Sequence, residues 1–277
     1  MPPSAFTASR PVIVVLGAGR SGTSLLMQVL AALGMRVSPA LIGAREDNPE
    51  GFYEDAGIVR IQADLMRALG AWPYHPLPAD WLDAPATAAA EIALRALLRE
   101  RLGEADDVWG FKDPRTASFL PLWQRIFAAG AIAPRYLLAL REPDDILRSF
   151  MRAYQASAPL AESVWLRRTC DALWHTQAAC HVVHYEDWFV RGDAVAAGLA
   201  RFCGLDTAAD TRMPGGLARP ELNRCGGPRV DTALASPQAR ALQAALRDCH
   251  GDIRERAQLL QRVADCRAAL DAPARPA

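Results

Sequence analysis

The stretch VIVVLGAGRSGTSLL, residues 12–26, carries the strongest structural signal in the chain. A run of β-branched residues passes through three glycines directly into an apolar pattern with helical spacing. A strand that turns at once into a helix leaves several backbone N–H groups pointing at one place, and the helix dipole reinforces them. We therefore expect this loop to bind an anion such as a phosphate.

The same letters fit two phosphate-binding motifs. Gly17, Gly19 and Gly22 spell G-x-G-x-x-G, the dinucleotide fingerprint, whereas residues 17–24 spell G-x-x-x-x-G-T-S, a nucleoside triphosphate loop with Thr23 in place of lysine. A dinucleotide fold needs an acidic residue about twenty positions further on. Residues 35–38 contain none, although Arg36 is suited to the extra phosphate of NADP. Neither motif is complete, so the loop alone does not identify its ligand.

Further apolar runs along the chain predict the fold class. They cover residues 12–16, 108–111, 136–140 and 181–185, with a short candidate at 35–37. Each long run is followed by a turn and a helical pattern, which predicts an α/β fold: a P-loop-type parallel β-sheet flanked by helices on both faces. In such sheets ligands bind at the carboxyl ends of the strands. We expect one domain over residues 11–270, with flexible ends at 1–10 and 271–277.

The segments between these strands include helices and two irregular loops. Helical patterns cover residues 58–69, ended by Gly70, and residues 87–102, 187–204 and 235–270. The proline-rich and aromatic stretch AWPYHPLPADW, residues 71–81, fits either a packed surface loop or a wall for a second substrate. Residues 213–229 read as a loop whose Arg224 and Arg229 either face solvent or close over a ligand.

Composition excludes several classes of function. The chain has 31 basic and 31 acidic residues, so no broad basic surface for nucleic acid or anionic lipid is expected. Its six cysteines form no C-x-x-C pair and predict reduced thiols and no metal site. No apolar window approaches the roughly 18 residues of a membrane span, and no signal peptide is evident, so we expect a cytoplasmic protein.

A second anion site is predicted in the stretch LLALREPDDILRSF, residues 137–150. Arg141 follows a predicted strand, Pro143 suits the first turn of the next helix, and Ser149 lies on that helix. A guanidinium fork and a hydroxyl at the end of a strand can hold a phosphate. A nucleotide with phosphates at two separate places fits this pattern better than ATP or NAD.

Four motifs in this order resemble those of sulfotransferases that use 3′-phosphoadenosine 5′-phosphosulfate (PAPS). The resemblance implies that Arg20, Ser21, Gly22, Thr23 and Ser24, with Gly19, bind the 5′-phosphosulfate. It also implies that Arg141 and Ser149 bind the 3′-phosphate, and that Tyr185, in Tyr-Glu-Asp, lies near the adenine. KDPRT, residues 112–116, is similar to a segment of tyrosylprotein sulfotransferases, and NPEGFYED, residues 48–55, resembles bacterial members of the family.

The catalytic residues that we expect are Lys112 and Glu54. Lys112 is the single lysine among 31 basic residues, follows a predicted strand and is suited to stabilise charge on the leaving oxygen, or else it only pairs with a carboxylate. Glu54 stands where the resembling enzymes carry a catalytic base, although Glu54 and Asp55 also fit helix-capping positions. Glu50 and His75 are alternative bases.

The acceptor is not identified by the sequence, which is compatible with a small molecule, a glycan or a lipid-linked group. Trp72, Tyr74 and Trp81 are candidates to contact it. The expected product of the donor is adenosine 3′,5′-bisphosphate, and no metal is expected. A P-loop kinase or NTPase and a nucleotide-binding module without catalysis remain alternatives at this point, and the oligomeric state is open.

Overall fold

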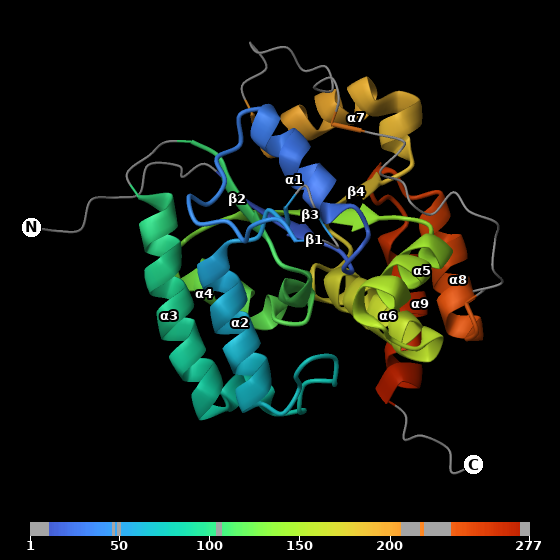
Figure 1. The fold of residues 1–277 in the computed structure, drawn as a ribbon, viewed down its shortest axis with the longest axis horizontal. Helices are drawn as coiled ribbons and strands as arrows, with labels where there is room; N and C mark the ends of the chain where they lie inside the picture. Colours follow the sequence, from blue (N-terminus) through green and yellow to red (C-terminus); the bar gives the residue numbers. More distant parts are fainter. Residues whose placement is uncertain are drawn as a thin grey trace, which may run out of the picture.

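The computed structural model describes residues 11–45, 48, 51–103, 107–205, 217–218 and 234–271. Within them, five strands form one sheet in the order β2-β1-β3-β4-β5 (Figure 1). The strands are β1 (Val12–Leu16), β2 (Trp109–Lys112), β3 (Pro134–Leu140), β4 (His181–His184) and β5 (Gly251–Asp252). The first four are parallel, which confirms the predicted α/β class, and β5 is antiparallel to β4.

Helices cover both faces of the sheet (Figure 1). They are α1 (Thr23–Ala32), α2 (Ala56–Ala68), α3 (Pro85–Leu102), α4 (Leu120–Ala129), α5 (Pro143–Tyr154), α6 (Ala158–His175), α7 (Asp187–Cys203), α8 (Pro237–Arg247) and α9 (Arg256–Asp271), with short 3-10 turns η1 (Trp81–Asp83) and η2 (Pro114–Ala117). Ile13 and Val15 of β1 pack with α1 and α7, whereas Val12, Val14 and Leu16 pack with the remaining helices. Strand alternation thus divides the core into two layers, one on each face of the sheet.

Two predicted elements differ in extent from the structure. The expected strand at residues 35–37 is reduced to a single parallel bridge between Arg36 and Trp109, in which the backbone of Arg36 is hydrogen-bonded to Val108 and Gly110. The helical region expected at residues 235–270 is present as two helices, α8 and α9, which β5 separates. Gly251, four residues after the end of α8, has a left-handed φ of 64° and pairs with Val182 at the edge of the sheet.

Three further features of the described residues concern membrane spans, cysteines and metal ligands. There, no helix has the length and apolar character that a bilayer crossing requires. The five cysteines in this part of the chain are free. No group of three or more histidine, cysteine or acidic side chains in the same residues is arranged to hold a metal ion.

Candidate active site

The loop between β1 and α1 has a shape that only glycine permits at two positions. At Gly17, with φ 144°, a Cβ atom would lie 2.7 Å from the carbonyl oxygen of Ala139. At Gly22, with φ 87°, a Cβ atom would lie 2.5 Å from the ring of Tyr185. The Ser21 hydroxyl donates to the carbonyl of Ala18 and closes the turn. The loop is therefore pressed against the ends of β3 and β4, and its inner surface is backbone.

Helix α1 begins directly at the end of this loop. Gly22 is its N-cap and provides no side chain to accept from the first N–H groups. Those N–H groups, with the positive end of the helix dipole, give this terminus the chemistry that suits an anion, as the sequence analysis expects. The Ser24 hydroxyl donates to the carbonyl of Phe52 at 3.2 Å, which attaches the start of α1 to the chain that leads into α2.

The predicted second anion site lies beside the loop. Arg20 Nε donates to Ser149 Oγ at 2.9 Å, and Arg141 Nη1 donates to the carbonyl of Arg20 at 3.3 Å. The Arg141 guanidinium also lies over the ring of Tyr185, 4.4 Å from its centroid. The structure thus brings together Arg20, Arg141, Ser149 and Tyr185, a set that we call the guanidinium cluster. The glycine loop and the predicted second anion site, which are far apart in the sequence, are therefore adjacent in the structure.

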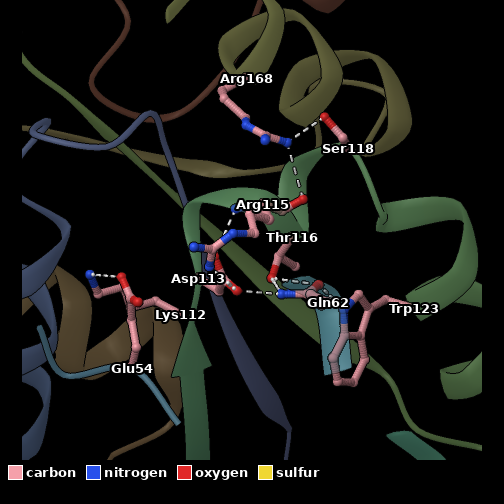
Figure 2. Close-up of polar contacts among 9 residues, drawn as sticks. All are labelled: Glu54, Gln62, Lys112, Asp113, Arg115, Thr116, Ser118, Trp123 and Arg168. Atoms are coloured by element: carbon pink, nitrogen blue, oxygen red, sulfur yellow. Dashed lines mark hydrogen bonds and ion pairs between the residues drawn. The ribbon is translucent and has the colours of Figure 1, made fainter. Parts of the chain in front are cut away.

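Lys112 and Glu54 form a buried ion pair at the end of β2, with Nζ and Oε1 2.8 Å apart (Figure 2). The Lys112 side chain is 3% exposed and that of Glu54 is 10% exposed. Burial raises the pKa of Glu54 above its usual value, against the opposing effect of Lys112. Glu54 therefore binds a proton more readily than an ordinary carboxylate, as a general base requires.

The adjacent carboxylate, Asp55, has a different role. Its Oδ1 accepts from the backbone of Gly57 and Ile58, so Asp55 is the N-cap of α2, and its Oδ2 pairs with Arg101 at 2.6 Å. Burial raises the pKa of Asp55, but hydrogen bonds from Arg101 and Ser38 outweigh it and hold the pKa below its usual value. The capping interpretation is thus correct for Asp55 and wrong for Glu54, whose side chain faces Lys112.

The remaining sequence candidates are distributed between two cavities. Trp72 and Tyr74 line the cleft that contains Glu54, whereas His75, which is exposed, lines a second cavity together with Trp81. The aromatic stretch is therefore a wall of both cavities. Glu50, Arg224 and Arg229 lie outside the described residues.

A cleft with a volume of about 940 Å³ reaches from the glycine loop to Glu54, and its lining residues do not include Lys112, Arg141, Ser149 or Tyr185. Gly19 and Arg20 line one part of it and Glu54 another. The wall also includes four arginines to which the sequence analysis assigned no role, of which Arg115 and Arg168 are the more buried and Arg45 and Arg152 are exposed. One feature of the sequence could have indicated Arg168: it is a charged residue four positions after Val164, on the apolar face of α6. Arg115 lies in the KDPRT stretch, three residues after Lys112.

A buried polar network supports the KDPRT stretch (Figure 2). Asp113, which is fully buried, caps η2 by accepting from the backbone N–H of Arg115 and also binds the Arg115 guanidinium through both carboxylate oxygens. Gln62 of α2 donates to Asp113 at 2.7 Å and accepts from Trp123 Nε1 at 3.0 Å. Residues distant in sequence therefore hold the end of β2 in one conformation.

Comparison with known proteins gives a family match. The family model described as "Sulfotransferase family" matches residues 11–209. The sulfotransferase domain from the Synechococcus PCC 7002 olefin synthase aligns at 18% identity and TM-score 0.46, over 99% of both chains. The sulfotransferase domain from the curacin biosynthetic pathway aligns at 14% identity and TM-score 0.44, over 96% of this chain and 100% of that one. No curated protein matches the chain.

Proposed function

Because this chain belongs to the sulfotransferase family, we propose that it moves a sulfuryl group from PAPS to a hydroxyl or amine of an acceptor. The observation that carries the proposal is the position of the guanidinium cluster beside a glycine loop, with Arg20 of that cluster lining the same cleft as Glu54. When bound, PAPS supplies an activated sulfuryl group attached to a bisphosphate leaving group. The cluster and the helix terminus supply the positive charge that such a nucleotide needs.

The residues at the loop fit a nucleotide with two phosphate positions. A Cβ atom at Gly19 would meet nothing within 4 Å, so the loop borders open space. In this proposal, residues 19–24 bind the 5′-phosphosulfate through backbone N–H groups and Arg20, and Arg141 and Ser149 bind the 3′-phosphate. The ring of Tyr185, beside Arg141, offers a surface for the adenine.

In this proposal, Glu54 removes a proton from the acceptor and Lys112 stabilises the negative charge that develops during transfer. The Lys112 ammonium has three N–H donors, of which one binds Glu54, and the others are suited to oxygens that gain negative charge during transfer. Glu54 takes the proton of the acceptor, aided by its raised pKa. Glu54 lines the cleft and Lys112 is bound to it, so an acceptor in the cleft lies beside both groups, in position for in-line attack.

The proposal is tested by the binding of adenosine 3′,5′-bisphosphate. It should bind far more tightly than AMP, ATP, NAD or NADP, and at 100 times its dissociation constant it should add about 2.7 kcal/mol of stability. For a chain of this size, that corresponds to a rise in melting temperature of about 5–10 °C. Transfer of labelled sulfate from PAPS to an extract of the host organism would then identify the acceptor.

Arg141→Ala tests the position of the 3′-phosphate. Loss of one partner of a buried charged contact should cost the bisphosphate about 2–5 kcal/mol of binding free energy and leave AMP binding nearly unchanged. Arg125→Ala is the control, because Arg125 pairs with Glu91 and does not line the cleft. Equal stabilisation by ATP and the bisphosphate would contradict the proposed function and favour a P-loop kinase or NTPase.

A further inference from the structure

The cleft that contains Glu54 carries more positive charge than Arg20 of the guanidinium cluster accounts for. Besides Arg20, its lining includes Arg45, Arg115, Arg152 and Arg168, and Glu54 is the one carboxylate among the described lining residues. Arg45 and Arg152 are exposed, whereas Arg168 is 7% exposed and Arg115 is partly buried. Buried cations are costly unless an anion faces them. Asp113 faces Arg115, so it is Arg168 that needs a specific explanation.

Arg168 is held in place by neutral groups. Its Nη1 donates to Ser118 Oγ at 2.6 Å and to the carbonyl of Arg115 at 3.3 Å (Figure 2). The nearest carboxylate in this chain of contacts is Asp171, which accepts from the Ser118 hydroxyl and also pairs with Arg267. Among the described residues, no direct ion pair of Arg168 is present. Burial lowers the pKa of Arg168, yet a guanidinium remains charged at neutral pH.

Arg115 lies between Arg168 and the Lys112–Glu54 pair (Figure 2). Asp113 binds its guanidinium, and Asp113 is in turn fixed by Gln62. The charge of Glu54 raises the pKa of Arg115, and that of Arg115 lowers the pKa of Glu54, so the two charges interact. Glu54, Arg115 and Arg168 line the same cleft, so a molecule that reaches Glu54 with its nucleophile can reach the two arginines with another part.

We propose that the acceptor carries an oxyanion, a carboxylate or a phosphate ester, in addition to the hydroxyl or amine that is sulfated, and that Arg115 and Arg168 bind this oxyanion. This inference rests on the proposed function. Planar guanidinium forks suit both kinds of oxyanion. The apolar part of the acceptor then contacts Tyr74, Phe150 and Val164, which line the same cleft.

The test measures binding to protein saturated with adenosine 3′,5′-bisphosphate. The probes are 3-(4-hydroxyphenyl)propanoate, its methyl ester and 2-(4-hydroxyphenyl)ethyl phosphate, titrated by calorimetry at constant ionic strength. Either anion should bind roughly 10- to 100-fold more tightly than the neutral ester, as expected for charge-assisted hydrogen bonds. The ratio of the dissociation constants of the carboxylate and phosphate probes identifies the kind of oxyanion that the site prefers. No preference for an anion, including no binding by any probe, would overturn the proposal.

Variants of neighbouring arginines locate the site. Arg168→Met and Arg115→Met should reduce the preference for the anion to less than threefold, and Arg168→Lys should weaken it while retaining the charge. Arg167→Met is the matched control: Arg167 is adjacent, pairs with Asp271 and lines the second cavity but not the cleft with Glu54, whereas Arg168 lines both. Loss of the preference in Arg167→Met but not in Arg168→Met would overturn the assignment.

Bisphosphate affinity separates this proposal from the proposed function. Arg168→Lys should bind the bisphosphate within twofold of wild type, because Arg168 faces the acceptor and not the donor. A large loss of bisphosphate affinity in Arg168→Lys would place this arginine in the donor site and overturn the inference. Failure of the wild-type protein to bind the bisphosphate would instead contradict the proposed function.

Discussion

Glu54 and Lys112 are within hydrogen-bond distance, so a substitution must separate base chemistry from charge pairing. Glu54→Gln keeps an oxygen that can accept from Lys112 but cannot take a proton. We predict that it lowers turnover by roughly 10²–10⁴, the range for loss of a general base. Affinity for the bisphosphate, measured by calorimetry, should stay within twofold of wild type and serves as the control for folding.

The pH profile gives a second readout for Glu54. A base must be deprotonated, and burial raises the pKa of Glu54, so wild-type kcat/KM should fall as pH falls through a value above 4.5. The Glu54→Gln variant should lack this acid limb. Retention of both the limb and the activity, within threefold of wild type, would remove Glu54 from the mechanism and direct attention to Glu50 or His75.

Lys112 stands alone as a lysine in a chain that otherwise uses arginine. We predict that Lys112→Ala lowers turnover by about 10²–10³, as loss of one donor to developing charge does. Lys112→Arg should recover little of this, because the guanidinium is a larger planar fork and the Lys112 site is 3% exposed. Full activity of Lys112→Arg, measured as initial rate at saturating donor, would show that any cation suffices.

At the scale of elements, α2 depends on Asp55 rather than on Glu54. Asp55→Asn keeps a good N-cap but removes the ion pair with Arg101. We predict that the free energy of unfolding at pH 7 falls by about 3 kcal/mol, the lower limit of the usual cost of removing one partner of a buried ion pair. The cost is at this limit because Arg101 retains its ion pair with Glu100. Denaturant unfolding measures this loss, and Asp64→Asn, which removes an exposed pair with Arg67, is the control with less than 1 kcal/mol.

The stability of this element should also depend on pH. The folded pKa of Asp55 lies below its ordinary value of 3.8, so the pair stabilises the protein above that pH. The contribution is lost as pH falls through the folded pKa. The difference between wild type and Asp55→Asn should therefore be largest near pH 7 and decrease below about pH 4. A difference that is independent of pH would show that the Asp55 charge does not contribute.

The element from β1 to α1 was predictable because its signals are local. A β-branched run, glycines at 17 and 22 and the apolar spacing that follows all lie within fifteen residues. Pro143 at the start of α5 and Gly70 after α2, with φ 69°, are local signals of the same kind. The break between α8 and α9 was not predictable in this way, because it depends on pairing with β4, about seventy residues earlier.

For the whole molecule, the parallel sheet is what assembles the site. The ends of β1, β2, β3 and β4 lie along one edge, so the residues that follow them meet although the chain separates them widely. Arg20 reaches Ser149 across 129 positions, and Lys112 reaches Glu54 across 58. Gly22 contacts the ring of Tyr185 in the same region. A parallel sheet requires long crossovers, so such contacts join distant segments.

Residue order alone was sufficient for the fold class, the glycine loop between β1 and α1 and the motifs that resemble sulfotransferases, because each depends on neighbours within one strand–loop–helix unit. Only the folded chain separated Glu54 from Asp55, because their roles depend on Lys112 and Arg101, which are distant in sequence. The same applies to the arginine wall: Arg168 is an ordinary helical charge until α6 packs beside η2 and buries it against Ser118. Burial and long-range partners determine what a charged side chain does, and neither is encoded locally.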